Sequence, residues 1–142
     1  MRQKTYSSER PEKLYRIENI QNSYCTVVFI DNITPLIDDE GNTYYEYESY
    51  VHDGILYRKN LDAMINKEFT VWLNEAKQYD YNQVATEIRK QRDKLLNDTD
   101  WTQMPDSALS KEKQDQYKVY RQALRDVPEQ EDFPYDVVFP TL

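Results

Sequence analysis

The residues that most often carry protein chemistry are sparse in this 142-residue chain. His52 is the only histidine, Cys25 is the only cysteine, and Gly41 and Gly54 are the only glycines. A single histidine rules out two-His and three-His zinc sites within one chain, and a single cysteine rules out an intramolecular disulfide. Two glycines so placed cannot supply the GxGxxG or GxxxxGK[ST] loops that bind phosphates. The sequence therefore predicts no cofactor.

His52 and Cys25 each allow a catalytic and a structural interpretation. His52 precedes Asp53 and Gly54, which is typical of a strand end followed by an Asp-Gly turn. The same His-Asp sequence would also suit a catalytic base beside a carboxylate. Cys25 could act as a nucleophile with His52, but its apolar run YCTVVFI is typical of a buried structural thiol. An enzyme such as a cell-wall hydrolase would depend on acids near His52, and nothing singles such residues out. We therefore expect a protein that is not an enzyme.

The loop NDTDWTQMPDSALS, residues 97–110, invites a metal because three aspartates lie in it. A calcium-binding EF-hand loop needs glycine at its sixth position and a bidentate glutamate at its twelfth. Counted from Asp98, those positions hold Gln103 and Leu109, and a loop counted from Asp38 fails in the same way. We expect no metal site in either loop.

The alternative is that this loop fastens two helices together. Arginine can hold a carboxylate in a two-pronged geometry that fixes orientation as well as adding energy. Trp101 is predicted to be buried between the two helices, and Ser110 is predicted to cap the second one. The predicted partners are the helix arginines and the loop carboxylates, namely Arg89, Arg92, Arg121 and Arg125 with Asp98, Asp100 and Asp106.

The first part of the chain has the alternation of β-strands. Residues 13–56 alternate polar and apolar side chains, and DDEG, residues 38–41, has the composition of a turn. A hairpin at this turn would pair ITPLI with TYYEY, with Pro35 at an edge or a bulge. Tyrosine offers a large contact area with a polar tip and is common at interfaces. The candidate interface consists of tyrosines from both faces of one strand, namely Tyr44, Tyr45, Tyr47 and Tyr50.

The later part of the chain has the periodicity of helices. Apolar residues recur every three or four positions over residues 59–79, 82–96 and 111–127, and a proline-rich extended tail follows. The fold class predicted is α+β, with an antiparallel β meander, a long helix and a helical hairpin. Three parts are predicted: residues 1–12, a polar arm that is flexible or ordered by a partner; residues 13–80, a β-rich subdomain with a long helix; and residues 81–142, the helical hairpin domain.

Composition narrows the partners further. The net charge is −8 and 31% of residues are charged, which disfavours binding to nucleic acid or to anionic membranes. Aromatic residues make up 13% of the chain, more than a disordered acidic chain carries. The first residues have no apolar stretch of the signal-peptide kind, and no later run approaches a membrane span. We expect a folded protein that is made in the cytoplasm.

Residues 88–130 resemble the family of bacteriophage tail assembly chaperones, and the resemblance extends to residue 142. Two arginine-bearing helices flank a Thr-Asp-Trp-Thr loop, and a proline-rich tail follows. Phe139 stands where the family often has tryptophan, and Tyr117 stands where an aromatic tryptophan is common. The matching positions are Arg89, Arg92, Asp93, Leu95, Leu96, Thr99, Asp100, Trp101, Thr102, Asp106, Tyr120, Arg121, Leu124, Arg125, Asp126 and Pro128.

The resemblance implies an assembly or structural role in a phage tail and implies no catalysis. The expected partners are other tail, baseplate or tail-fibre proteins, and self-association into a homo-oligomer is left open. A structural component would remain in the tail of the virion, whereas a transient chaperone would act in the host cytoplasm and be absent from the particle. No relative is recognised for the β-rich half, so any function specific to that half stays open.

Overall fold

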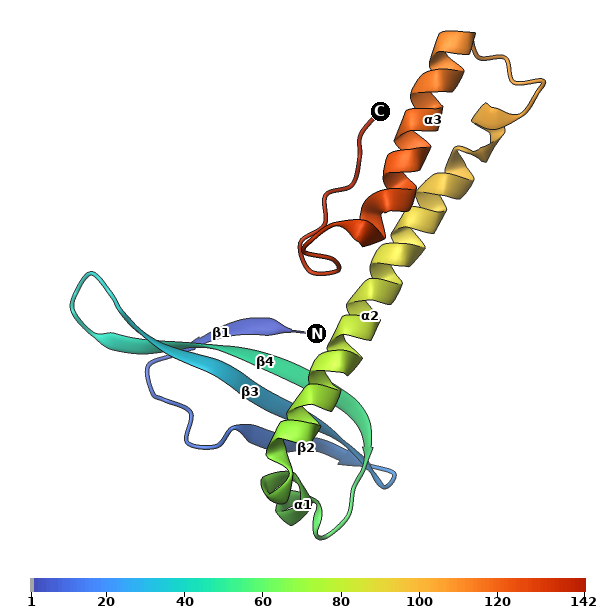
Figure 1. The fold of residues 1–142 in the computed structure, drawn as a ribbon. Helices are drawn as coiled ribbons and strands as arrows, with labels where there is room; N and C mark the ends of the chain where they lie inside the picture. Colours follow the sequence, from blue (N-terminus) through green and yellow to red (C-terminus); the bar gives the residue numbers. More distant parts are fainter. Residues whose placement is uncertain (1) are drawn as a thin grey trace. The chain divides into compact units, whose positions relative to one another are not determined.

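The computed structural model describes residues 2–142, which divide into two compact units, Met1–Asn82 and Gln83–Leu142 (Figure 1). An antiparallel sheet in the first unit is followed along the chain by helices, so the predicted α+β class with N-terminal strands is confirmed. One helix, α2 (Phe69–Asp98), contributes residues to both units.

The sheet of the first unit has four strands in the order β1-β4-β3-β2. Strands β2, β3 and β4 form the predicted antiparallel meander, and β1 pairs with the outer side of β4. The bounds are β1 Gln3–Ser7, β2 Tyr15–Gln21, β3 Tyr24–Ile37 and β4 Thr43–Leu56.

Strand β1 corrects the prediction of a flexible or partner-ordered arm over residues 1–12. Gln3–Ser7 is an edge strand of the chain's own sheet, in register with Tyr45–Ser49 of β4. Lys4 and Tyr6 both reach Glu46, at 3.3 and 2.9 Å. The strand is held by main-chain pairing and polar side chains, so the lack of apolar residues did not signal disorder.

The hairpin at residues 38–41 forms as predicted. Thr34 to Ile37 pair with Glu46 to Thr43. The Asp38 carboxylate accepts the backbone N–H groups of Glu40 and Asn42 at 3.0 and 2.8 Å, and Gly41 adopts φ +85°. An aspartate that accepts such bonds, followed by a glycine with positive φ, produces this turn.

Pro35 lies after a bulge in β3 and on a free edge, as predicted. The N–H of Asp38 donates to the carbonyl of Asn42, and bonded pairs alternate along an antiparallel ladder. The nitrogen of Pro35 therefore faces away from β4. Among the residues described here, no strand lies on that side, because the β2 pairing of β3 covers Tyr24–Phe29 only.

The helices break at a different place from the one predicted. Helix α1 (Leu61–Lys67) ends at Glu68, and α2 then runs without interruption to Asp98. The expected interruption of the helix at Tyr79–Tyr81 is therefore wrong, although the boundary expected there lies close to the division between the two compact units after Asn82. No glycine or proline lies within α2, so nothing in its backbone interrupts the hydrogen-bond ladder there.

The core of the first unit lies between the sheet and the two helices. In Figure 1, α1 and the first part of α2 lie across one face of the sheet. Phe29 and Ile65 are fully buried at this contact, and the phenol of Tyr15 donates to Asp62 at 2.7 Å. The buried cluster comprises Tyr15, Cys25, Val27, Phe29, Tyr50, Ile55, Leu61, Ile65, Leu73 and Ala76.

The second unit contains the end of α2, the short helix η1 (Asp100–Gln103), α3 (Lys111–Asp126) and the short helix η2 (Val127–Glu129). Residues 131–135 form turns, and residues 137–142 have no regular secondary structure. The Gln130 side chain closes this segment by bonding the backbone N–H and C=O of Val138 at 2.9 and 2.8 Å.

Candidate functional site

Arg121 fastens α3 to the end of α2 and to η1. Its guanidinium donates to the Leu96 carbonyl at 2.5 Å, to the Thr99 hydroxyl at 2.8 Å and to the Asp100 carboxylate at 2.5 Å. The Arg121 residue is 7% exposed. A rigid, always charged group with several N–H donors can satisfy all three acceptors at once. The predicted meeting of an arginine with a loop carboxylate therefore occurs here.

The other predicted arginine–loop pairs do not form. Arg92 binds its neighbour Asp93 at 2.6 Å, and Asp98 binds Lys94 instead of an arginine. Arg89 lies over the ring of Phe133, 5.2 Å from its centre. Arg92 and Asp98 thus pair with neighbours in their own helix, where a local partner costs less conformational entropy than a distant one.

Three further residues of the predicted set lie on the surface. Asp106 and Arg125 are exposed and make no hydrogen bond or ion pair with the residues that the structure describes. Asp126 accepts a hydrogen bond from Gln122 at 2.8 Å. Ser110 caps α3 as predicted, because its hydroxyl accepts the Lys113 N–H at 3.3 Å.

Trp101 does not lie buried between the helices as predicted. It is 50% exposed and packs one side against Tyr117, with ring centres 6.3 Å apart. The buried residue of η1 is its neighbour Thr102, which is fully buried and donates to the Thr99 carbonyl at 2.7 Å.

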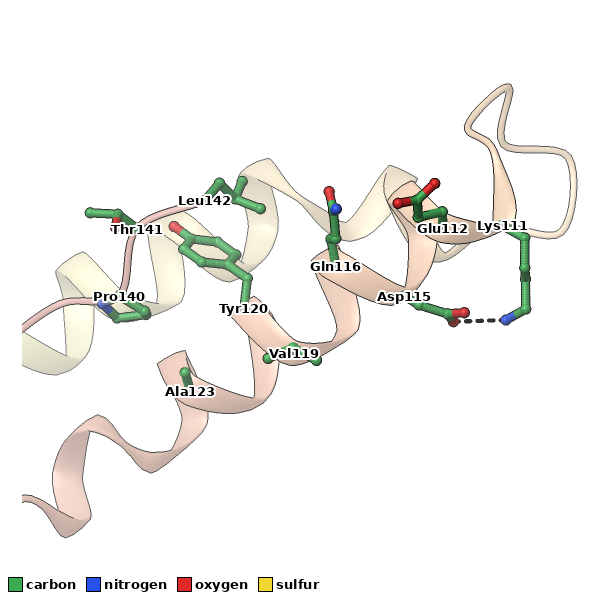
Figure 2. Close-up of a pocket in the computed structure, with 10 residues that line it drawn as sticks. All are labelled: Lys111, Glu112, Asp115, Gln116, Val119, Tyr120, Ala123, Pro140, Thr141 and Leu142. Carbon is green, nitrogen blue, oxygen red and sulfur yellow. Dashed lines mark hydrogen bonds and ion pairs between the residues drawn. The ribbon is translucent and has the colours of Figure 1, made fainter.

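A groove of about 1050 Å³ lies between α3 and the end of the chain, as Figure 2 shows. Tyr120, a residue of the family pattern, lies on one wall with Val119 and Ala123. Pro140 and Leu142 lie on the opposite wall. Val119 is 72% exposed, so the apolar part of this face is open to solvent, and Glu112, Asp115 and Gln116 continue the face along the helix.

The sequence prediction missed the groove. Leu124 is fully buried on the inner face of α3, whereas Val119 is 72% exposed, although both are apolar residues of the predicted helix over residues 111–127. An apolar residue outside the main stripe of a helix is the signal that could have found a second apolar patch. The tail side of the groove had no such signal, because the turn at residues 131–135 sets its path.

His52 and Cys25, the two residues considered for catalysis, contact other parts of the fold, and no hydrogen bond joins their side chains in the described part of the chain. The His52 ring stacks on Tyr79 with centres 4.6 Å apart, and its Nδ1 donates to the Asp53 carbonyl at 3.1 Å. His52 lies within β4 and not before a turn, because the Asp-Gly pair lies at a bulge of that strand. Burial raises the pKa of the Cys25 thiol, which disfavours the reactive thiolate. Within residues 2–142, no three potential ligands gather as a metal site would require.

The four candidate interface tyrosines differ in exposure. Tyr47 and Tyr50 are 8% and 5% exposed, so their rings belong to the interior of the first unit and offer no surface. Tyr50 also has Lys77 over its ring at 5.3 Å. Tyr44 and Tyr45 are half-buried, and the exposed Tyr6 of β1 lies beside Tyr44 at 6.2 Å.

Comparison with known proteins identifies only the second unit. No curated protein and no solved structure gives a significant match to the chain. None of the helices in the described part is both long enough and apolar enough to cross a membrane. The C-terminal segment, residues 85–142, matches the family model described as phage tail assembly chaperone protein.

Proposed function

We propose that the chain is a non-enzymatic phage tail protein that binds other tail, baseplate or tail-fibre polypeptides. The observation that carries this proposal is the coincidence of two boundaries. The family match begins at residue 85, and the second compact unit begins at Gln83. The matched segment therefore coincides with one compact unit, in which Arg121 holds α3 and Ser110 caps it.

Exposed apolar side chains on both units support a binding role. In the second unit Val119 and Leu142 are 72% and 68% exposed. In the first unit Ile37 and Tyr6 are 73% and 60% exposed. Exposed apolar clusters mark interaction surfaces when they are contiguous, as at the groove of α3. Two such units in one chain suit a component that joins two neighbours in a tail or tail fibre.

A second candidate is a transient chaperone in the host cytoplasm that leaves before the virion is complete. The description of the matched family favours it. Such a chaperone would cover the apolar surface of one tail polypeptide until that polypeptide assembles.

Mass spectrometry of purified virions separates the two candidates. A tail component is expected in the particle at a fixed ratio to the main tail protein, through repeated density-gradient purification. A transient chaperone is expected in infected cells and in isolated assembly intermediates, but not in the particle. If the chain is absent from both particles and intermediates, and its gene can be deleted without loss of tails, the tail role itself is wrong.

A further inference from the structure

Helix α3 carries an apolar patch outside its buried face, formed by Val119, Tyr120 and Ala123 and continued along the helix by polar and charged residues. Leu124 and Val127 are fully buried on the inner side. On the outer side Val119 is 72% exposed, and Leu142 across the groove is 68% exposed. Figure 2 shows Val119, Ala123 and Tyr120 on the helix, with Pro140 to Leu142 running past Tyr120. A helix with an apolar patch outside its buried face has a surface for a second element.

The groove is long enough for a helix. Its lining on α3 runs from Lys111 to Ala123, which at 1.5 Å per residue spans about 18 Å, or about three helical turns. Its volume of about 1050 Å³ is slightly above the roughly 300–1,000 Å³ that small-molecule sites occupy.

The walls favour recognition through side chains. The backbone of α3 is hydrogen-bonded within the helix, so it offers no ladder to an extended peptide. The opposite wall carries Pro140, which has no N–H and interrupts strand pairing. An amphipathic helix that packs its apolar stripe into a groove needs no main-chain hydrogen bonds from either wall.

The charged residues at the far end of the groove indicate that the partner carries a basic residue there. Asp115 accepts from Lys111 at 2.7 Å and lies 3.3 Å from Lys118, so its charge is offset. Glu112 lies at the groove and is exposed, and it has no ion pair with the described residues. It lies two helical turns from Val119, so a basic residue two turns from the partner's apolar anchor would meet it.

We propose that this groove binds an amphipathic helix of a tail or tail-fibre polypeptide, with an apolar stripe over Val119 and Leu142 and a lysine or arginine beside Glu112. The proposal rests on the proposed function, because it names the site through which the tail partner is held.

The first test is photocrosslinking at position 119 in infected cells. A photoreactive amino acid replaces Val119, and the matched control places it at Val71, a 53% exposed helical valine of the first unit. The crosslinked peptide is identified by mass spectrometry. We expect a tail or tail-fibre segment with helical apolar periodicity and a basic residue, obtained from position 119 only. A crosslink to a second copy of this chain, a segment without that pattern, or equal yield from both positions would overturn the proposal.

The second test measures binding of a synthetic peptide with the crosslinked sequence. Val119→Glu is expected to weaken binding by about ten-fold or more, because it places a charge in the apolar part of the groove. Val138→Glu, at a 74% exposed valine outside the lining, is the matched control and should change binding less than about two-fold. Glu112→Lys should weaken binding at low salt, and a peptide with its basic residue changed to glutamate should restore it. Equal affinities of the two valine variants would contradict the proposal.

Complementation separates failure of the groove from failure of the proposed function. A phage that lacks the gene is supplied with wild type, Val119→Glu or Val138→Glu, and tailed particles are counted by electron microscopy. Both valines are exposed, so both variants should show the circular dichroism and melting temperature of the wild type. Loss of tails with Val119→Glu alone supports the groove. If the deletion loses tails but Val119→Glu restores them to wild-type counts, the groove proposal is wrong. If the deletion itself makes normal tails, the proposed function is wrong.

Discussion

Arg121 and Asp100 form an asymmetric ion pair in which the cation is buried and the anion is not. Their nearest nitrogen and oxygen are 2.5 Å apart, and their side chains are 9% and 62% exposed. The guanidinium is therefore kept in the interior by the Leu96 carbonyl and the Thr99 hydroxyl as well as by Asp100. The carboxylate retains access to water, so the pair is not a fully desolvated one.

This asymmetry predicts unequal effects of removing the two partners. Arg121→Ala should lower the free energy of unfolding of the second unit by about 2 kcal/mol, because it removes a charged donor from three acceptors. Asp100→Asn should lower it by less than about 1 kcal/mol, because exposed ion pairs contribute little. Urea denaturation followed by far-ultraviolet circular dichroism measures both. Equal losses for the two variants would mean that the buried donors of Arg121 do not hold α3.

Truncation of Trp101 should have a modest effect. Because half of the indole is exposed, Trp101→Ala should lower the free energy of unfolding by about 1 kcal/mol. Leu124→Ala, at a fully buried position on α3, should lower it by about 3 kcal/mol. The same denaturation experiment compares them, and a larger loss at Trp101 than at Leu124 would show that the indole is buried in solution.

The first unit should lose stability in acid through Asp31. Partial burial by itself raises the pKa of Asp31, but hydrogen bonds from Lys77 and from the backbone of Asn32, with the attraction of the ammonium group, hold it below its ordinary value. A lowered folded pKa stabilises the fold above the unfolded value of about 3.9, and that stability is lost as the pH falls through the folded value.

Asp31→Asn should therefore flatten the fall of the urea midpoint between neutral pH and acid. Asp39→Asn, which removes the same charge from an exposed turn position, is the control and should leave the fall unchanged. If both variants lose stability in acid as the wild type does, the Asp31–Lys77 contact does not cause the loss of stability at low pH.

Alkaline pH should act on the first unit through Tyr15. Burial, the hydrogen bond to Asp62 and the nearby carboxylate charge raise the pKa of Tyr15 to about 12. A raised folded pKa stabilises the fold fully below the unfolded value of about 10, and this stability is lost as the pH rises from there through the folded value. The tyrosinate absorbance of the wild type minus that of Tyr15→Phe should titrate near pH 12. A difference curve centred near the ordinary tyrosine value would show that the phenol is accessible to water.

Local patterns were enough to predict several elements. Alternation and the Asp38–Gly41 turn predicted the β3–β4 hairpin and its register, and Ser110 predicted the start of α3. Such features depend on neighbours within a few residues, whose physical preferences are known. The family pattern also led to the correct C-terminal segment.

Features that depend on distant contacts were mispredicted. The polar triplet at residues 79–81 looked like a helix break, but Asp80 is fully buried and Tyr79 stacks on His52, which lies far away in the sequence. From the sequence, three aspartates of the loop were equivalent candidates to pair with Arg121, and in the structure Asp100 is the one that does. Composition could not show which of Trp101 and Thr102 faces the interior, because that choice depends on the space available in η1.

The position of Pro35 bears on how the protein behaves at high copy number. An unpaired strand edge is a template on which identical chains can add strand after strand and grow into cross-β fibres. At the free edge of β3 the outward-facing nitrogen of Pro35 carries no hydrogen, so that template lacks a donor at the middle of the Thr34–Ile37 segment. Pro35 thus weakens strand addition at the edge of a hairpin whose Ile37 is 73% exposed.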